Sequence, residues 1–319
     1  MSEPGLAPAK GRPRTVVWLE LAAIVLFWSA NWLITKAAFA YASPLAFTSM
    51  RFVCALVAMA AFSAITRQPF LPLAGERVGL GLIGLLQIGG MIGFGFTGLE
   101  YFGPGRAAVL IYTMPIWCIP LGWLLARERV SWSGLIGGAT GLAGLILFLN
   151  PGAVNWSDSR VWIGTGLCLA GAISWALGAS LYRRQSWRTG FWTQTYWQVL
   201  WTAVLVSPPL WIAGANRPVV WSAGLIAALA YNAVLATALC YWWWAKVLAT
   251  TSAARAGQFL TLVPVCALLM SRAVTGEAVG LLAGAGVVLI CAGVIVTLRG
   301  RNPGQAKVRS ADPLEVPSR

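Results

Sequence analysis

The residues best suited to bind a solute are aromatic and neutral hydrogen-bonding side chains inside long apolar stretches. Trp28 and Asn31 are three residues apart and share one face of a helix with Thr35. Polar side chains in an apolar helix avoid lipid and face the interior of a bundle. We therefore expect a site for an amphipathic small molecule, which needs apolar walls and a few hydrogen-bonding groups. Further candidates of this kind are Gln87, Tyr112, Trp175, Tyr231, Asn232 and Gln258.

Two prolines interrupt stretches that otherwise have a helical pattern. Pro115 and Pro264 each lack the backbone N–H that a helix needs, so each should kink its helix. We interpret them as hinges, and the carbonyl groups that they free are further candidate contacts to a solute. For the polar and aromatic candidates, the competing interpretation is packing, in which they only hold neighbouring helices together.

This chain contains few of the residues that catalytic and metal-binding sites use. There is no histidine, which excludes a Ser-His-Asp triad, a histidine metal site and the usual haem ligands. The six cysteines all lie in apolar stretches without a C-x-x-C pair, as expected for small buried hydrophobes. We therefore expect neither a metal nor a cofactor, and we expect the protein not to be an enzyme.

The elements that position the candidate residues are membrane helices. Of the 319 residues, 58% are apolar and only 10% are charged, against about 25% charged in soluble domains. Ten apolar stretches reach the length of about 20 residues that a hydrocarbon core requires. Strands of a membrane barrel are about half as long, so we predict an all-α membrane protein. The stretches cover residues 16–40, 44–66, 77–98, 104–126, 131–149, 160–182, 190–213, 219–244, 252–273 and 278–298.

The distribution of basic residues predicts the orientation. With the N-terminus inside, seventeen of the 23 Lys and Arg residues lie on the inner side and four on the outer side. This bias is typical of cytoplasmic loops. It predicts cytoplasmic tails at 1–15 and 300–319, and it assigns the net charge of +14 to topology and lipid headgroups rather than to nucleic acid.

An internal repeat relates the two halves of the chain. The triplet Arg106, Pro115 and Glu128 recurs 149 residues later, and Trp28 and Trp175 match at an offset of 147. Chance is the alternative, because proline and glycine are common here. The later copies, together with two glycines that match Gly137 and Gly144, are Arg255, Pro264, Glu277, Gly286 and Gly293.

The repeat predicts an inverted architecture. Each half, 16–150 and 160–298, contains five predicted spans. Because five is odd, the second half must enter the membrane from the opposite side. Inverted repeats of this kind recur in secondary transporters, with the substrate site near the midplane between the halves.

The repeated residues resemble those of a known family. Ten spans, a tryptophan in the first and sixth, and a proline in the fourth and ninth followed by glutamate are similar to the EamA-type members of the drug/metabolite transporter superfamily. Arg127-Glu128-Arg129 fits an element of that family, whereas Glu277 is followed by Ala278 and departs from it. The Tyr112-x-x-Pro115 element resembles bacterial amino-acid exporters that accept aromatic substrates.

The resemblance implies a transporter of the bacterial inner membrane that exports small amphipathic metabolites by alternating access. Amino acids, including aromatic ones, are the favoured substrates. None of the nine acidic residues lies mid-membrane, so we expect facilitated diffusion or exchange without tight proton coupling. A multidrug or cation exporter is an alternative, although a cationic solute would require an anionic counter-ion in the membrane. A lipid-modifying membrane enzyme is a second alternative, although no acid–base cluster is visible.

The expected partners are a small-molecule solute and the lipid bilayer. Small residues allow helices to approach closely, and two stretches contain G-x-x-x-G spacings: Gly134–Gly144 in the fifth span and Gly280 with Gly284 in the tenth. We expect the fifth span to pack on the tenth; a homodimer is the alternative use of these faces.

Two further expectations concern single places in the chain. Arg51 is expected to contact an outer vestibule, and Tyr241-Trp242-Trp243-Trp244 is expected to lie in an aromatic belt at the membrane interface.

Overall fold

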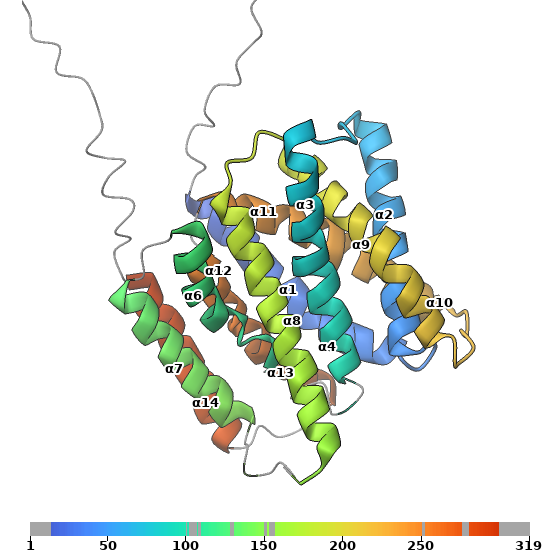
Figure 1. Ribbon diagram of the computed structural model, residues 1–319. Coiled ribbons are helices and arrows are strands. Elements are labelled where there is room, and N and C mark those ends of the chain that lie inside the picture. Colours follow the sequence, from blue (N-terminus) through green and yellow to red (C-terminus); the bar gives the residue numbers. More distant parts are fainter. Residues whose placement is uncertain are drawn as a thin grey trace, which may run out of the picture.

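The protein is a bundle of helices (Figure 1). The computed structural model describes residues 14–99, 101, 107, 110–127, 131–149, 152, 157–250, 253–275 and 281–299, and these contain no strand. Apart from Arg14 and Thr15, the predicted tails lie outside the described residues, as do Arg106, Glu128 and Glu277 of the repeat.

The first five spans consist of the following segments. α1 is Arg14–Ala38 and α2 is Pro44–Thr66. The third span joins η1 (Ala74–Glu76), α3 (Arg77–Gly84), η2 (Leu85–Gly90) and α4 (Met91–Leu99). The fourth contains α6 (Met114–Ala126), and the fifth is α7 (Trp132–Leu149).

The second five spans follow the same plan. α8 is Ser159–Arg184 and α9 is Phe191–Gly214. The eighth span joins α10 (Ala223–Ala230), η4 (Tyr231–Leu239) and α11 (Cys240–Thr250). The ninth joins α12 (Ala253–Leu260) and α13 (Leu262–Thr275), and the tenth is α14 (Leu281–Arg299). Five of these segments are long and apolar enough to cross a membrane, and shorter apolar helices form other spans. The predicted all-α, ten-span membrane fold is confirmed.

Contacts between the halves follow a two-fold exchange in which each span is replaced by the one five places later. α1 packs on α11 and α13 of the eighth and ninth spans, while α8 packs on α4 and α6 of the third and fourth. The pairs α2 with α9, α6 with α12, and α7 with α14 map onto themselves under the same exchange. This pairing is the structural expression of the inverted repeat.

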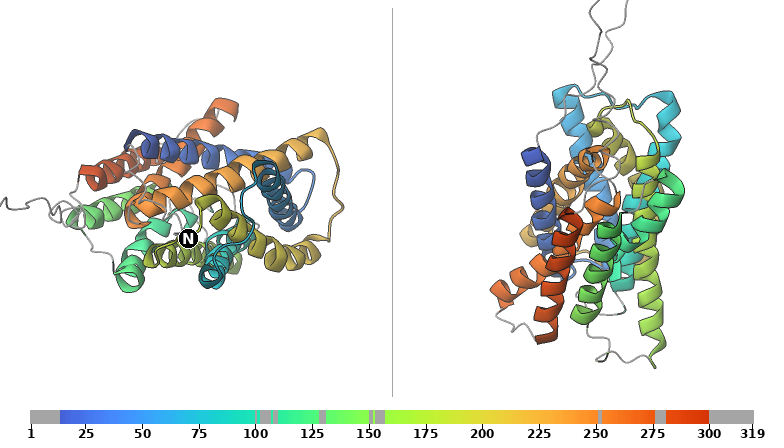
Figure 2. Two further views of the ribbon diagram at one scale, coloured as in Figure 1. Left: turned by 90° about the horizontal axis from the view of Figure 1, so that it is seen from above. Right: turned by 90° about the vertical axis from the view of Figure 1, so that its left-hand side faces the viewer.

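The fifth and tenth spans pack as predicted. α7 and α14 lie side by side along their length (Figures 1 and 2). A methyl group on Gly137 would lie 2.5 Å from the carbonyl oxygen of Gly293, and one on Gly144 would lie 2.7 Å from that of Gly286. The two backbones therefore touch at the four glycines of the repeat, and each of the two in α7 faces the repeat copy of the other one. The predicted Gly284 does not take part, because a methyl group there would meet open space.

Two π-helical turns occupy equivalent places in the two halves. η2 lies within the third span and η4 within the eighth, which the two-fold exchange interconverts. A π turn accommodates an extra residue in a helix and is frequent at functional sites. Candidate residues lie on both turns, namely Gln87 on η2, and Tyr231 and Asn232 on η4.

The helices are interrupted just before the two repeated prolines. The Thr113 hydroxyl donates to the carbonyl oxygen of Leu110 at 2.6 Å, and the Thr261 hydroxyl donates to that of Gln258 at 2.6 Å. Pro115 is the second residue of α6 and Pro264 the third of α13. Each proline thus begins a new helix after a break, where its missing N–H costs no hydrogen bond. Their hinge motion stays a prediction.

A buried carboxylate fastens one end of the bundle. Glu76 in η1 is 6% exposed and accepts hydrogen bonds from the backbone N–H groups of Arg188, at 2.7 Å, and Thr189, at 3.1 Å. These residues lie in the connection between α8 and α9. The carboxylate therefore joins the start of the third span to the start of the seventh.

Replacing Glu76 by alanine is expected to loosen that connection. Two backbone donors lose a charged acceptor, and leaving such a group without its partner costs about 1–3 kcal/mol. Trypsin should cleave faster after Arg188 in Glu76→Ala than in the parent protein. Glu76→Gln, which keeps one acceptor oxygen, should show an intermediate rate. Equal cleavage rates in all three proteins would show that the carboxylate does not fasten the segment.

Candidate solute-binding site

Three tryptophans from three spans form the aromatic centre of the bundle. Trp244 of α11 is 1% exposed and lies between Trp28 of α1 and Trp175 of α8, with ring centroids 6.3 Å and 4.9 Å away. The Trp28 indole donates to the carbonyl oxygen of Ala236 in η4 at 2.9 Å. The two tryptophans that the repeat aligns are thus brought together, with a third between them.

The central position of Trp244 corrects the interfacial-belt prediction. Tyr241 is 3% exposed and its ring lies 5.5 Å from that of Trp28. Tyr241 and Trp244 are three residues apart, so they share the helix face that points into the bundle. That spacing was the available signal in the sequence. Trp243, by contrast, is half-buried and stacks on Phe27 with ring centroids 6.2 Å apart.

Buried polar atoms without a hydrogen-bond partner concentrate on the central spans. Within the described part of the chain they occur on the first, third, sixth, eighth and ninth spans. Buried polar groups are nearly always paired with protein, water or ligand. Because these unpaired polar groups lie on helices at the interface of the two halves, they indicate a binding site for a polar solute. The atoms are Asn31 Oδ1, Gln87 Nε2, Trp175 Nε1, Ser180 Oγ, Trp244 Nε1 and Gln258 Oε1.

Four of the predicted site residues belong to this unpaired set. Asn31 lies on α1, Gln87 on η2, Trp175 on α8 and Gln258 on α12. Gln87 packs against α8 one turn from Trp175, because a methyl group on Gly178 would lie 2.8 Å from its Cβ. Gln87 and Trp175 each present an N–H donor, whereas Asn31 and Gln258 each present an acceptor oxygen.

Two other predicted residues are engaged within the protein. The Tyr231 hydroxyl donates to the carbonyl oxygen of Phe27 at 2.9 Å. Asn232 donates through Nδ2 to the carbonyl oxygen of Ala228 at 2.9 Å and accepts from the Thr35 hydroxyl at 3.3 Å. The bonds with Phe27 and Thr35 connect the first and eighth spans, so both residues act as helix-to-helix contacts in this conformation.

Tyr112 lies at the break before α6, next to a tryptophan that the sequence did not single out. Its hydroxyl accepts a hydrogen bond from the Trp32 indole at 3.3 Å, and the two rings lie 6.2 Å apart. Trp32 is one residue beyond Asn31 on α1 and is 9% exposed. It extends the aromatic lining from the centre toward the end of α1.

Arg51 corrects a second expectation, since it is buried instead of facing an outer vestibule. Its side chain is 2% exposed and its Nε donates to the Thr237 hydroxyl at 2.9 Å. Helix α2 packs on η4, which places the guanidinium within electrostatic range of Tyr112 and Tyr241. The sequence shows the charge seven residues inside its span, but not which neighbour that face meets.

Comparison with known proteins assigns the family. The model of the EamA-like transporter family matches the chain twice, over residues 15–150 and over residues 162–299. The chain belongs to the EamA-like transporter family. The resemblance seen in the sequence is confirmed, and each EamA match spans one five-helix half.

Relatives of this EamA-like protein cover nearly its whole length. A Bacillus subtilis protein named "Uncharacterized transporter YoaV" is 25% identical over 283 residues, covering 88% of this chain and 96% of its own. An Archaeoglobus fulgidus protein named "Uncharacterized transporter" is 26% identical over 290 residues, covering 89% of this chain and 99% of its own. A protein crystal structure at 19% identity matches 89% of this chain and 96% of that one with a TM-score of 0.71, which supports the fold.

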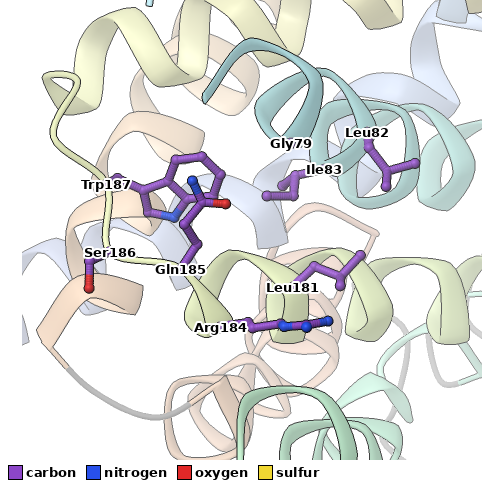
Figure 3. Close-up of a pocket in the computed structure, with 8 residues that line it drawn as sticks. All are labelled: Gly79, Leu82, Ile83, Leu181, Arg184, Gln185, Ser186 and Trp187. Atoms are coloured by element: carbon purple, nitrogen blue, oxygen red, sulfur yellow. The ribbon is translucent and has the colours of Figure 1, made fainter. Parts of the chain in front are cut away.

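This EamA-like chain also has a pocket away from the polar centre (Figure 3). It has a volume of about 550 Å³ and lies between the start of α3 and the end of α8. None of the predicted site residues lines it. Its charged residue is Arg184, which Figure 3 shows beside Leu181. The pocket opens at the end of the bundle that Glu76 fastens.

The described part of the chain groups no three His, Cys, Asp or Glu residues in a way that could hold a metal ion. One ion pair in the described part of the chain joins α1 to α11. Glu20 of α1 lies 3.7 Å from the ammonium group of Lys246 in α11, and the latter also lies over the ring of Trp242 at 3.4 Å.

Proposed function

We propose that this membrane transporter exports small amphipathic metabolites, with amino acids, including aromatic ones, as the favoured substrates. The observation that carries the proposal is the set of unpaired polar atoms among buried tryptophans. Trp28, Trp175 and Trp244 offer flat apolar surfaces, and Asn31, Gln87 and Gln258 offer both acceptors and donors. An amino acid with a large side chain needs this combination.

The proposed mechanism is alternating access between two inverted halves, without tight proton coupling and without catalysis. Of the carboxylates that the structure describes, Glu20 pairs with Lys246, Glu76 binds backbone N–H groups, and Asp158 caps α8. Glu76 and Asp158 lie at helix starts, and Glu20 lies about two helical turns before Trp28 on α1, where its charge is paired. A proton relay or an acid–base catalyst would need such a group near the solute.

The proposed location is the bacterial inner membrane with both tails in the cytoplasm. The basis is the excess of basic residues on one side. An Escherichia coli (strain K12) relative, 30% identical over 164 residues and matching 50% of each chain, is named "Uncharacterized inner membrane transporter YedA". A homodimer would have to use surfaces other than the glycine faces of α7 and α14, since these faces cover each other.

A cation exporter is the less well supported alternative. Aromatic rings attract cations, but the buried guanidinium of Arg51 lies within electrostatic range of Tyr241, whose ring lies against that of Trp28. A cationic solute would be repelled by it. The observations therefore favour solutes that carry a carboxylate.

Counterflow in proteoliposomes tests the proposal. Vesicles loaded with one unlabelled amino acid should take up the same labelled compound, and aromatic amino acids should give the highest rates. Trp28→Ala and Trp175→Ala should lower uptake by about tenfold, the equivalent of one lost aromatic contact. Trp132→Ala is the matched control, because Trp132 is 80% exposed. Absence of counterflow for every amino acid in the panel would refute the substrate class.

A further inference from the structure

Arg51 is a buried cation for which the described part of the chain supplies no carboxylate. A guanidinium has five N–H donors, and the hydrogen bond from Nε to Thr237 uses one of them. The described carboxylates Glu20, Glu76 and Asp158 all bind elsewhere. A buried charge is costly unless an opposite charge or several hydrogen bonds compensate it.

The groups around Arg51 suit an anion with an apolar body. Tyr112, Tyr231 and Tyr241 lie within electrostatic range of its guanidinium. Tyr112 accepts its hydrogen bond from Trp32, which leaves its own O–H free to donate. The ring of Tyr241 lies against that of Trp28. The cation therefore stands beside the hydroxyl donor of Tyr112 and at the edge of the aromatic centre.

We propose that Arg51 binds the carboxylate group of the transported solute, which makes an organic acid or amino acid with a flat apolar body the substrate class. This inference rests on the proposed transport function. Guanidinium and carboxylate form paired, charge-assisted hydrogen bonds that are stronger than neutral ones. The indole rings would hold the apolar body. The unpaired oxygens of Asn31 and Gln258 would accept from an amino group where the solute has one.

Three matched ligands test the proposal on the full-length protein in lipid nanodiscs. L-Phenylalanine has a carboxylate and an amine, 3-phenylpropionate has only the carboxylate, and phenethylamine has only the amine. Binding is measured by quenching of tryptophan fluorescence. Both carboxylates should bind to the wild-type protein, and phenethylamine should bind at least about tenfold more weakly, as expected for loss of a charge-assisted pair.

Variants assign the effect to Arg51. Arg51→Gln should weaken both carboxylates by about tenfold or more and leave phenethylamine unchanged or tighter, whereas Arg51→Lys should retain part of the affinity. Arg160→Gln, at an exposed arginine at the start of α8, should bind like the wild type. If Arg51→Gln does not fold, the ranking of the three ligands on the wild-type protein remains decisive.

The proposal is overturned if phenethylamine binds the wild-type protein as tightly as 3-phenylpropionate, or if a folded Arg51→Gln binds both carboxylates like the wild type. Arg51-dependent carboxylate binding without amino-acid counterflow would refute the amino-acid substrate class alone. Counterflow that is insensitive to Arg51→Gln would refute only the role of Arg51.

Discussion

Replacing Trp244 or Trp175 by phenylalanine is expected to cost little stability while weakening solute binding. Both indole N–H groups are buried without a partner, and an unsatisfied buried donor costs about 1–3 kcal/mol. Phenylalanine removes that penalty, which offsets the smaller ring volume. If the N–H groups serve the solute, transport falls although the fold is intact.

Trp28→Phe is the matched comparison with the opposite expectation. The Trp28 indole donates to the carbonyl oxygen of Ala236, so the substitution loses a hydrogen bond that the other two indoles do not make. We expect Trp28→Phe to be less stable than Trp244→Phe by about 2 kcal/mol, measured by thermal unfolding in the same detergent. Equal losses of stability in the three variants would contradict the distinction between paired and unpaired indoles.

Replacing Gly286 by alanine is expected to separate the fifth span from the tenth. The added methyl group would lie 2.7 Å from the carbonyl oxygen of Gly144 and 2.8 Å from the backbone nitrogen of Phe148. Neither backbone atom can move without shifting a whole helix, and overpacking of this kind costs about 1–3 kcal/mol. The unfolding temperature should fall, and α14 should become accessible to proteolysis.

Gly284→Ala is the control for this substitution. It lies two residues earlier on the same helix, and its methyl group would meet nothing within 4 Å. Since alanine favours a helix over glycine by about 1 kcal/mol, this variant should be as stable as the parent or more stable. A Gly286→Ala protein that unfolds at the same temperature as Gly284→Ala would show that the backbones of α7 and α14 do not need their close contact.

The spans, the repeat and the glycine pairing were predictable because each depends on local or periodic sequence information. Apolar length gives the spans, and the recurrence of Pro115 and Gly137 gives the halves. The partners of buried side chains were not predictable to the same extent. Arg51 and Trp244 reach the centre because α2 packs on η4 and because α11 turns one face inward. A single sequence does not state which faces of ten similar helices meet.

For the polar candidate residues, too, the sequence predicts one property and not another. Asn31, Gln87 and Gln258 could be chosen because amides are rare in apolar helices. Whether each is satisfied depends on distant neighbours. Asn232, equally conspicuous in the sequence, is paired with Thr35 and Ala228. The two π turns, which set the register of the residues that follow them, leave no signature in hydropathy or spacing.

The difference between Trp28 and Trp175 has a consequence for symmetry. A two-fold axis in the membrane plane exchanges the two faces of the membrane as it exchanges the two halves of the chain. If the halves were identical in conformation, both faces would be equivalent and the molecule would have no direction. One indole of this pair is hydrogen-bonded and its mate is not. The two membrane faces of this conformer are therefore distinguished by the differences between its two halves, and not by either half alone.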